Sequence, residues 1–217
     1  MFGVAFGGNG GGGVTAPDDY IAFYPLESNS LDSSVNGHDG TDTKITYDGV
    51  SALVGAGNGK IITSSITGTF TGFSQTIWVK FPSGCDRMYF TRANSNIFMY
   101  LGDSGGAYIY SIMNGATICD EPNNTVPLDN AFHHVRFTWG KDVNSGFMRV
   151  HIDDVEISLG TSNAKLTDFV ITTFGELIWN NSSDSAFNVA NNRLYGRALT
   201  DEEGTAIYDL EKTKFGL

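Results

Sequence analysis

The strongest constraint on the fold is the way in which short apolar runs recur along the chain. Runs such as "SQTIWVKFP", "NIFMYLGD" and "HHVRFTWG" are separated by clusters of Gly, Asn, Ser and Asp. Their spacing of about 8 to 15 residues is typical of a β-sandwich or β-barrel. Within one run, alternation places Ile77, Val79 and Phe81 on one face and Trp78 and Lys80 on the other. We therefore predict an all-β sandwich.

One segment near the end of the chain has a helical pattern. In "TDEEGTAIYDLEKTK", Thr200 is a predicted N-cap, and Glu203 occupies the third helical position of a capping box. We expect a short helix there. The chain has 217 residues, of which 41% are hydrophobic. One domain of this size buries enough surface to fold without a disulfide or a metal. The sequence contains no internal repeat and no sign of a second folded domain.

The charge of the chain and the length of its apolar runs argue against two kinds of partner, nucleic acids and membranes. The chain has 13 basic and 24 acidic residues, a net charge of −11, and no Lys/Arg cluster. Such a surface repels phosphate backbones, so no nucleic-acid partner is expected. No run of 18 apolar residues occurs, so no membrane-spanning helix is expected. Cys85 and Cys119 lack metal-site spacing, and either a disulfide or two reduced thiols fits them.

Residues 1–16 form a glycine-rich arm ahead of the domain at residues 17–217. Six of the seven residues from 7 to 13 are glycine, with neither a basic region nor an apolar stretch of signal-peptide length. We therefore expect synthesis in a cytoplasm without export through this segment. Phe2, Val4 and Phe6 alternate ahead of the glycines and could add as a strand to a groove on a partner. The arm is accordingly predicted to dock, and the alternative is that it serves only as a spacer.

Four stretches resemble the concanavalin A-like, laminin-G-like jelly-roll family. They are "YPLESNSLDSSVNGHDGT", "FSQTIWVKF", "AFHHVRFTWG" with "MRVHIDDVEIS", and "NNRLYGRALTDEEGTAIYD". They follow the family's order over about residues 20 to 210. The resemblance implies an antiparallel jelly-roll sandwich with a hairpin turn at Asp153–Asp154. Members include carbohydrate-binding modules, adhesion domains, glycosidase accessory domains and phage virion proteins. Many bind sugar at a sheet face or rim, and some bind calcium.

The stretch "HIDDVE" is similar to the Glu-x-Asp-x-x-Glu strand of related jelly-roll glycosidases. Retaining glycosidases need two carboxyls about 5–5.5 Å apart. Here His151 stands at the first carboxylate position, and Asp153 and Glu156 face opposite sides of an unbulged strand. His133 and His134 are adjacent on a strand, so they cannot share one metal, and we interpret them as structural. Phosphate loops and nucleophile motifs are absent, and no enzymatic activity is predicted.

Calcium is the one ion for which the sequence offers ligands. Asp32, Asn36, Asp39 and Asp42 supply oxygen atoms within one loop. The alternative is an ordinary turn, since Asn and Asp tolerate left-handed backbone. The closing strand reads Ala-Asn-Asn at residues 190–192, where the resembling family often has an acidic residue. This departure argues against calcium, and no other cofactor is predicted.

A sugar site needs an aromatic platform beside amide or carboxylate groups. Two stretches provide such residues, "IWNNSSD" in a predicted loop and "GGAYIY" on one face of a strand. The alternative for each aromatic residue is a place in the sandwich core. The candidate sugar-binding residues are Trp179, Asn180, Asn181, Asp184, Tyr108 and Tyr110.

Two functional hypotheses remain, with glycoside hydrolase as a disfavoured third. The first is a non-enzymatic virion structural protein of phage, either a capsid decoration, a head-fibre or a tail-fibre protein. Its lectin-like head would be anchored to other virion proteins by the arm, and the protein would be made in the host cytoplasm. The second is a carbohydrate-binding module or adhesin. The absence of an export signal and of an attached catalytic domain favours the first. The sequence leaves the oligomeric state open, because it contains neither heptads nor a collagen-like repeat that would indicate a homo-oligomer.

Overall fold

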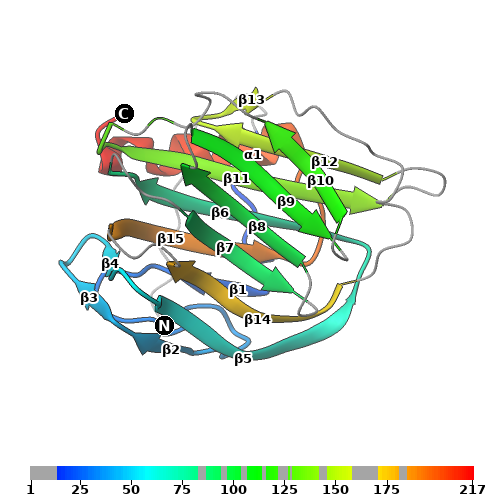
Figure 1. Cartoon of the computed structure of the whole chain (residues 1–217). Helices are drawn as coiled ribbons and strands as arrows, with labels where there is room; N and C mark the ends of the chain where they lie inside the picture. Colours follow the sequence, from blue (N-terminus) through cyan, green and yellow to red (C-terminus); the bar gives the residue numbers. More distant parts are fainter. Residues whose placement is uncertain are drawn as a thin grey trace.

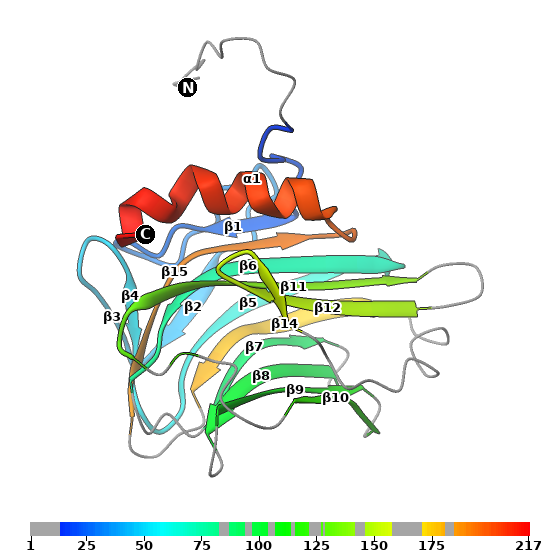
Figure 2. The ribbon, with the colours of Figure 1, turned by 90° about the horizontal axis from the view of Figure 1, so that it is seen from above.

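The protein is a sandwich of two antiparallel sheets with one helix on its outside (Figures 1 and 2). The computed structural model describes residues 14–82, 87–93, 97–103, 107–113, 116–121, 127, 129–141, 146–157, 171–180 and 185–217. This architecture confirms the prediction of an all-β jelly roll with a short C-terminal helix. No helix in these ranges is long and apolar enough to cross a membrane.

The first sheet, here sheet A, has the strand order β13-β12-β11-β6-β15-β4-β3, with β1 also paired to β15. Its strands are β1 (Ala22–Tyr24), β3 (Ile45–Tyr47), β4 (Ala52–Val54), β6 (Gly72–Lys80), β11 (Phe132–Lys141), β12 (Gly146–Ile152), β13 (Val155–Ile157) and β15 (Phe187–Tyr195). The long strands β6, β11 and β15 lie at the centre of this sheet.

The second sheet, here sheet B, has the order β10-β9-β8-β7-β14-β5-β2. Its strands are β2 (Gly40–Thr43), β5 (Gly59–Phe70), β7 (Arg87–Ala93), β8 (Ile97–Asp103), β9 (Ala107–Met113), β10 (Ala116–Glu121) and β14 (Ile171–Asn180). Successive strands such as β5 and β6, or β14 and β15, belong to different sheets. The chain therefore crosses repeatedly between the layers, as a jelly roll requires.

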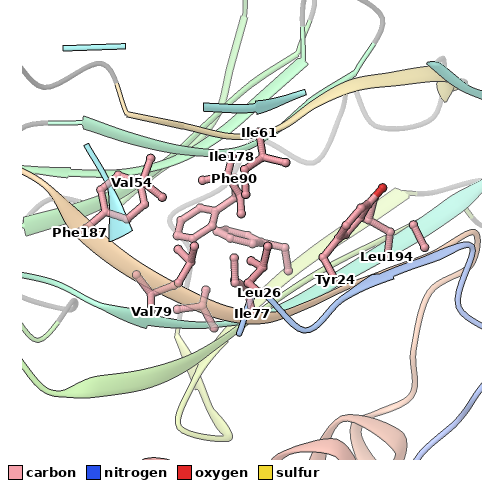
Figure 3. Close-up of a cluster of buried hydrophobic side chains, with 14 of the residues drawn as sticks. Tyr24, Leu26, Val54, Ile61, Ile77, Val79, Phe90, Ile178, Phe187 and Leu194 are labelled. Atoms are coloured by element: carbon pink, nitrogen blue, oxygen red, sulfur yellow. The ribbon is translucent and has the colours of Figure 1, made fainter. Parts of the chain in front are cut away.

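The hydrophobic core lies between the two sheets (Figure 3). Ile77, Val79 and Phe81 are at most 2% exposed and belong to this core, so the alternation predicted from the sequence is confirmed. Sheet B contributes Phe90 and Ile178, which are also buried. Alternation then places the neighbours of these core residues on the outer faces of the sheets.

The helix α1 (Asp201–Glu211) and the short 3-10 helix η2 (Lys212–Phe215) cover the outer face of sheet A (Figure 2). The Thr200 hydroxyl accepts from the Glu203 N–H at 3.2 Å, and the Glu203 carboxylate accepts from the Thr200 N–H at 2.9 Å. The predicted capping box is thus present. Trp78 is fully buried although it faces away from the core, because its ring stacks on Phe215 at 4.4 Å.

A buried polar cluster joins the end of α1 to sheet A. Glu211 is 5% exposed, and its carboxylate accepts from Trp78 Nε1 and Asn191 Nδ2 at 2.7 Å each. The same carboxylate pairs with Arg193 Nη2 at 2.6 Å. A buried charge needs such partners to offset its lost hydration. The part of the outer face of sheet A that lies beneath the end of α1 is therefore occupied by structural contacts.

The chain enters the domain on the same side as α1. Ala16 and Tyr20 pack against a small cluster that includes Tyr195 and Ile207. The Tyr195 hydroxyl donates to the carbonyl of Pro17 at 3.2 Å. Residues 1–13 lie outside the described part of the chain, and with them the predicted docking residues Phe2, Val4 and Phe6.

Candidate functional site

The outer face of sheet B lies on the opposite side of the sandwich from α1 (Figure 2). Ile61, Phe90 and Ile178 point from this sheet into the core and are at most 1% exposed. Each is followed or preceded by a residue on the outer face, because successive strand residues alternate. No helix among the described residues covers this face.

Strand register aligns one outward position from each of six neighbouring strands. Directly paired residues of antiparallel strands share a face of the sheet. Trp179 pairs with Tyr89, Tyr89 with Tyr100, and Tyr100 with Tyr110. We call these four positions the aromatic row. The pairs Trp179–Lys60 and Tyr110–Asp120 extend it by one charged position at each end.

The aromatic row runs across the strands rather than along them. Neighbouring strands are about 4.7–4.9 Å apart, so four strands give the row a length of roughly 14 Å between its end positions. Outward positions on one side of the row include Arg87, opposite Gly102 on β8. On the other side, Arg92 lies opposite Glu176 on β14 and Phe98 on β8. The row is thus a stripe of aromatic positions between two rows of mixed character.

The register places three of the predicted sugar-binding residues at outward positions of sheet B. Trp179 and Tyr110 both belong to the aromatic row, and Tyr108 lies two residues from Tyr110 on β9. Trp179 occupies strand β14 rather than the predicted loop. Asn181 and Asp184 lie outside the described residues.

The prediction for Asn180 needs correction. Its side chain is fully buried, and Nδ2 donates to the carbonyls of Val54 at 3.1 Å and Ser185 at 2.8 Å. A buried amide with these partners cannot contact a sugar in this conformation. Asn180 therefore holds the end of β14 against β4 and the segment that precedes β15.

Sequence reasoning missed Tyr89 and Tyr100, which occupy the middle of the aromatic row. Tyr100 lies in "NIFMYLGD", one of the recurring apolar runs, and Tyr89 lies in "RMYFTRA", another run of the same kind. Their alignment with Trp179 depends on strand order and register, and neither follows from periodicity alone. The sequence offered one signal for these two residues, because consecutive predicted strands each carry a tyrosine at a position that alternation places on the outer face.

The residues predicted to bind calcium each have partners within the protein. Asp32 accepts from the backbone N–H of Phe23 at 2.9 Å and of Ser34 at 2.8 Å through Oδ1, and from the His38 N–H at 2.8 Å through Oδ2. Burial raises the pKa of Asp32, but these hydrogen bonds outweigh it and lower the pKa below its usual value. This carboxylate therefore organises the loop between β1 and β2.

The other three residues of that set have separate contacts. Asp39 Oδ1 accepts from the Asp32 N–H at 3.0 Å, and Asn36 Nδ2 donates to the Ile21 carbonyl at 2.9 Å. Asp42 accepts from the Tyr47 hydroxyl at 2.6 Å. Within the described ranges, no three His, Cys, Asp or Glu side chains gather as a metal site.

His133 and His134 face different surroundings. Nδ1 of His133 lies 2.6 Å from an Asp153 oxygen and Nε2 lies 3.1 Å from Asp129, and the hydrogen bond to Asp153 is the main cause that raises the pKa of His133. His134 is 1% exposed and packs against the rings of Trp78 and Tyr208. The two side chains share no partner, as their adjacent positions on β11 require.

The turn between β12 and β13 explains the "HIDDVE" stretch. Asp153 and Asp154 have φ angles of 50° and 64°, and they form the hairpin turn implied by the family resemblance. Asp153 binds His133, and Asp154 accepts from the Thr205 hydroxyl at 2.7 Å. Both carboxylates therefore lie in a turn and hold neighbouring elements in place.

Comparison with protein families identifies the domain. The family model described as the concanavalin A-like lectin/glucanases superfamily matches residues 55–203. The chain belongs to this superfamily. The match runs from the residues that precede β5 to the first turn of α1 and so includes all four strands of the aromatic row. The protein is a lectin-like jelly-roll domain. Comparison with curated proteins finds no match.

Solved structures with the same fold include receptor-binding domains of botulinum neurotoxins. The serotype D binding domain is 13% identical with a TM-score of 0.67, and the match covers 89% of this chain and 52% of that one. The receptor-binding domain of the C/D mosaic serotype is 12% identical, with a TM-score of 0.65 and the same coverage. The serotype D ligand-binding domain in complex with N-acetylneuraminic acid is 10% identical, with a TM-score of 0.64 and coverages of 89% and 51%. The chain spans about half the length of each of these domains, and the likeness is one of fold.

Proposed function

We propose that this protein is a non-enzymatic carbohydrate-binding domain and that the outer face of sheet B binds the sugar. The observation that carries the proposal is the aromatic row, in which Trp179, Tyr89, Tyr100 and Tyr110 occupy paired positions on four adjacent strands. Membership of a lectin-containing superfamily supports a binding role. The structural use of Asp153 and Asp154 supports the absence of catalysis.

Aromatic residues suit sugars for a physical reason. One face of a pyranose ring exposes mainly C–H groups, which pack on an aromatic ring, while its hydroxyls need polar partners. Tyrosine supplies both an apolar ring and a hydroxyl. The competing explanation is that paired aromatic residues only stabilise sheet B, where cross-strand pairs contribute roughly 0.2–1 kcal/mol each. Binding measurements on variants separate the two.

A sugar panel with matched variants tests this function. Tyr89→Ala removes a ring from the middle of the row, and Phe147→Ala removes a half-exposed ring from β12 of sheet A. We expect wild-type protein and Phe147→Ala to bind the same sugars. Tyr89→Ala should bind at least tenfold more weakly, which corresponds to about 1.4 kcal/mol, while keeping the wild-type circular dichroism. If the panel yields no ligand, or Tyr89→Ala binds it as tightly as wild type, the proposal fails.

We further propose that the domain is a head displayed on a phage particle and anchored by its N-terminal arm. Residues 16–20 are fixed on the α1 side, through Tyr20 in the Tyr195 cluster and through the pair of Asp19 with Arg197 at 2.7 Å. A particle attached through the arm would therefore approach from that side. Sheet B would face away from the particle, where a receptor sugar is accessible.

Incorporation into particles tests this second part. A chain lacking residues 2–13 keeps Asp19 and Tyr20, so the head should fold and bind sugar as before. We expect it to be absent from purified particles that incorporate the full chain. Normal incorporation of the shortened chain would contradict anchoring by the arm.

A further inference from the structure

We propose that acidification releases the C-terminal segment from sheet A while the two sheets stay folded. The C-terminal segment is here residues 207–217, which comprise the second half of α1, the helix η2 and the last two residues. The proposal is independent of sugar binding. It rests on the buried position of His134, on the positive charges around that residue and on the separate packing of the segment.

His134 lies on the outer face of sheet A beneath the C-terminal segment. Its side chain is 1% exposed, and its ring packs against Trp78 at 5.1 Å and against Tyr208 of α1 at 5.8 Å between ring centroids. Phe215 of η2 stacks on the same tryptophan at 4.4 Å. The segment therefore keeps this imidazole away from water.

A proton on His134 would be a buried charge without a hydrogen-bonding acceptor at one ring nitrogen. The ring atom Nε2 is buried and has no hydrogen-bond partner. Asp153 in the turn after β12 accepts from the backbone N–H of this residue at 2.9 Å. On the segment, the Glu211 carboxylate already binds Trp78, Asn191 and Arg193, and Lys212 pairs with Asp209. A buried charge that lacks a partner is costly.

The basic residues of sheet A add to this cost. Burial is the main cause that lowers the pKa of His134 to about 3, and the charges of Arg136, Arg193 and His151 lower it further. Once the segment has moved away, the imidazole meets water and regains its ordinary pKa near 6.5. Below that pH, protons bind to the released form and not to the closed form. A change from pH 7 to pH 5 should therefore favour release by roughly 25-fold.

The C-terminal segment packs apart from the hydrophobic core. Among the described residues, the core cluster between the sheets contains none from the segment. Ile207 belongs to a small separate cluster with Tyr195 and Leu199. The strands of sheet A pair with one another rather than with the helix. Loss of the segment therefore leaves the core and the strand pairing in place.

The start of α1 stays attached in acid. Arg197 pairs with Asp19 and with Glu203 at 2.7 Å each. Hydrogen bonds from this arginine are the main cause that lowers the pKa of both carboxylates, so both remain charged at pH 5. The segment therefore turns away about the first half of α1, and its release uncovers the rings of Trp78 and Phe132.

The remaining partly buried histidine of β11 does not oppose this movement. The pKa of His133 is raised by Asp153 and Asp129, and neither carboxylate belongs to the segment. These contacts persist in the released form and are lost only when the sheets unfold. A measurement confined to the segment therefore reports the effect of His134 separately from that of His133.

Hydrogen–deuterium exchange of the full chain at pH 7 and pH 5 measures the release. After correction for the pH dependence of intrinsic exchange, the opening constant of the amides in residues 207–217 should rise roughly 25-fold at pH 5. Amides of β6, β11 and β15 should keep their protection at both pH values. No rise in the segment, or an equal loss of protection in these strands, would overturn the proposal.

Matched variants assign the effect to one histidine. In His134→Gln the rise should fall below about threefold, whereas His38→Gln, in the Asp32 loop, should keep the full rise. Phe215→Ala weakens the packing of the segment without removing the histidine, so it should raise exchange at both pH values and keep the roughly 25-fold ratio. Equal rises in wild type and His134→Gln would overturn the proposal. So would a Phe215→Ala protein whose segment exchanges equally at both pH values while remaining mostly closed at pH 7.

Discussion

Gly204 allows helix α1 to lie directly on the buried guanidinium of Arg136. A Cβ atom at position 204 would lie 1.0 Å from Nη1 and 2.0 Å from Cζ of Arg136. The arginine is 2% exposed and donates through Nη1 to the carbonyls of Thr200 at 3.4 Å and Asp201 at 3.2 Å. Its Nη2 lies 3.6 Å and 3.8 Å from carboxylate oxygens of Asp201 and Asp154. Gly204→Ala must therefore move either the helix or this charge.

The expected magnitude follows from two opposing effects. In an ordinary helix interior, Gly→Ala raises stability by about 1 kcal/mol. Separating a buried charge from its partners lowers stability by about 3–5 kcal/mol. Gly204→Ala should therefore lower the free energy of unfolding by about 2–4 kcal/mol, which reverses the ordinary sign.

Urea denaturation followed by tryptophan fluorescence measures this change. Glu202→Ala alters an exposed position of the same helix and should change stability by less than about 1 kcal/mol. In an Arg136→Met background the guanidinium is gone, so adding Gly204→Ala should do much less damage than it does in the wild type. A stability gain of about 1 kcal/mol for Gly204→Ala in the wild-type protein would refute the contact.

Three further changes test other parts of the structure. Burial, aided by the nearby charge of Arg136, lowers the pKa of His134 to about 3 and also lowers that of His151. At His134 the unfolded chain therefore takes up the proton first, and this residue should lower stability as the pH drops below about 6.5, by about 2 kcal/mol at pH 5. The raised pKa of His133 acts in the opposite sense, so the urea midpoints of wild type and His134→Gln are compared at pH 7 and pH 5; the same change of midpoint in both proteins would contradict this. Glu211→Ala leaves buried donors unpaired and should lower the free energy of unfolding by about 3–5 kcal/mol. The control Asp209→Ala removes an exposed ion pair with Lys212 and should lower it by less than about 1 kcal/mol. Equal urea midpoints for the two variants would be inconsistent with the buried cluster. Asp32→Ala leaves three backbone N–H groups without their acceptor and should lower the free energy of unfolding by about 2–3 kcal/mol. A thermal midpoint equal to that of wild type would show that the carboxylate does not organise its loop.

Local sequence signals predicted much of the fold because they depend on residues close together in the chain. The alternation of Ile77, Val79 and Phe81 and the capping box of Thr200 and Glu203 both appear in the structure as predicted. The burial of Trp78 could not be predicted from the sequence around it. Its position away from the core was predicted, but its burial depends on a helix more than 100 residues later, as the contact with Glu211 shows.

The candidate site depended on information that the sequence does not display. Trp179 and Tyr110 were singled out for their residue types, whereas their alignment with Tyr89 and Tyr100 requires the strand order of sheet B. Asn180 looked like a sugar ligand because it follows a tryptophan in a polar stretch. Its burial arises from the end of β4, which approaches it from a distant part of the chain.

Mapping the bound sugar onto the backbone tests the account most directly. The oligomer that binds best in the sugar panel would be titrated into isotope-labelled protein, and the amide shifts would be followed by NMR. The account predicts that the largest shifts occur in β14, β7, β8 and β9 around the aromatic row, while α1 and the Asp32 loop change little. Shifts concentrated in the Asp32 loop or in sheet A, with sheet B unchanged, would contradict it.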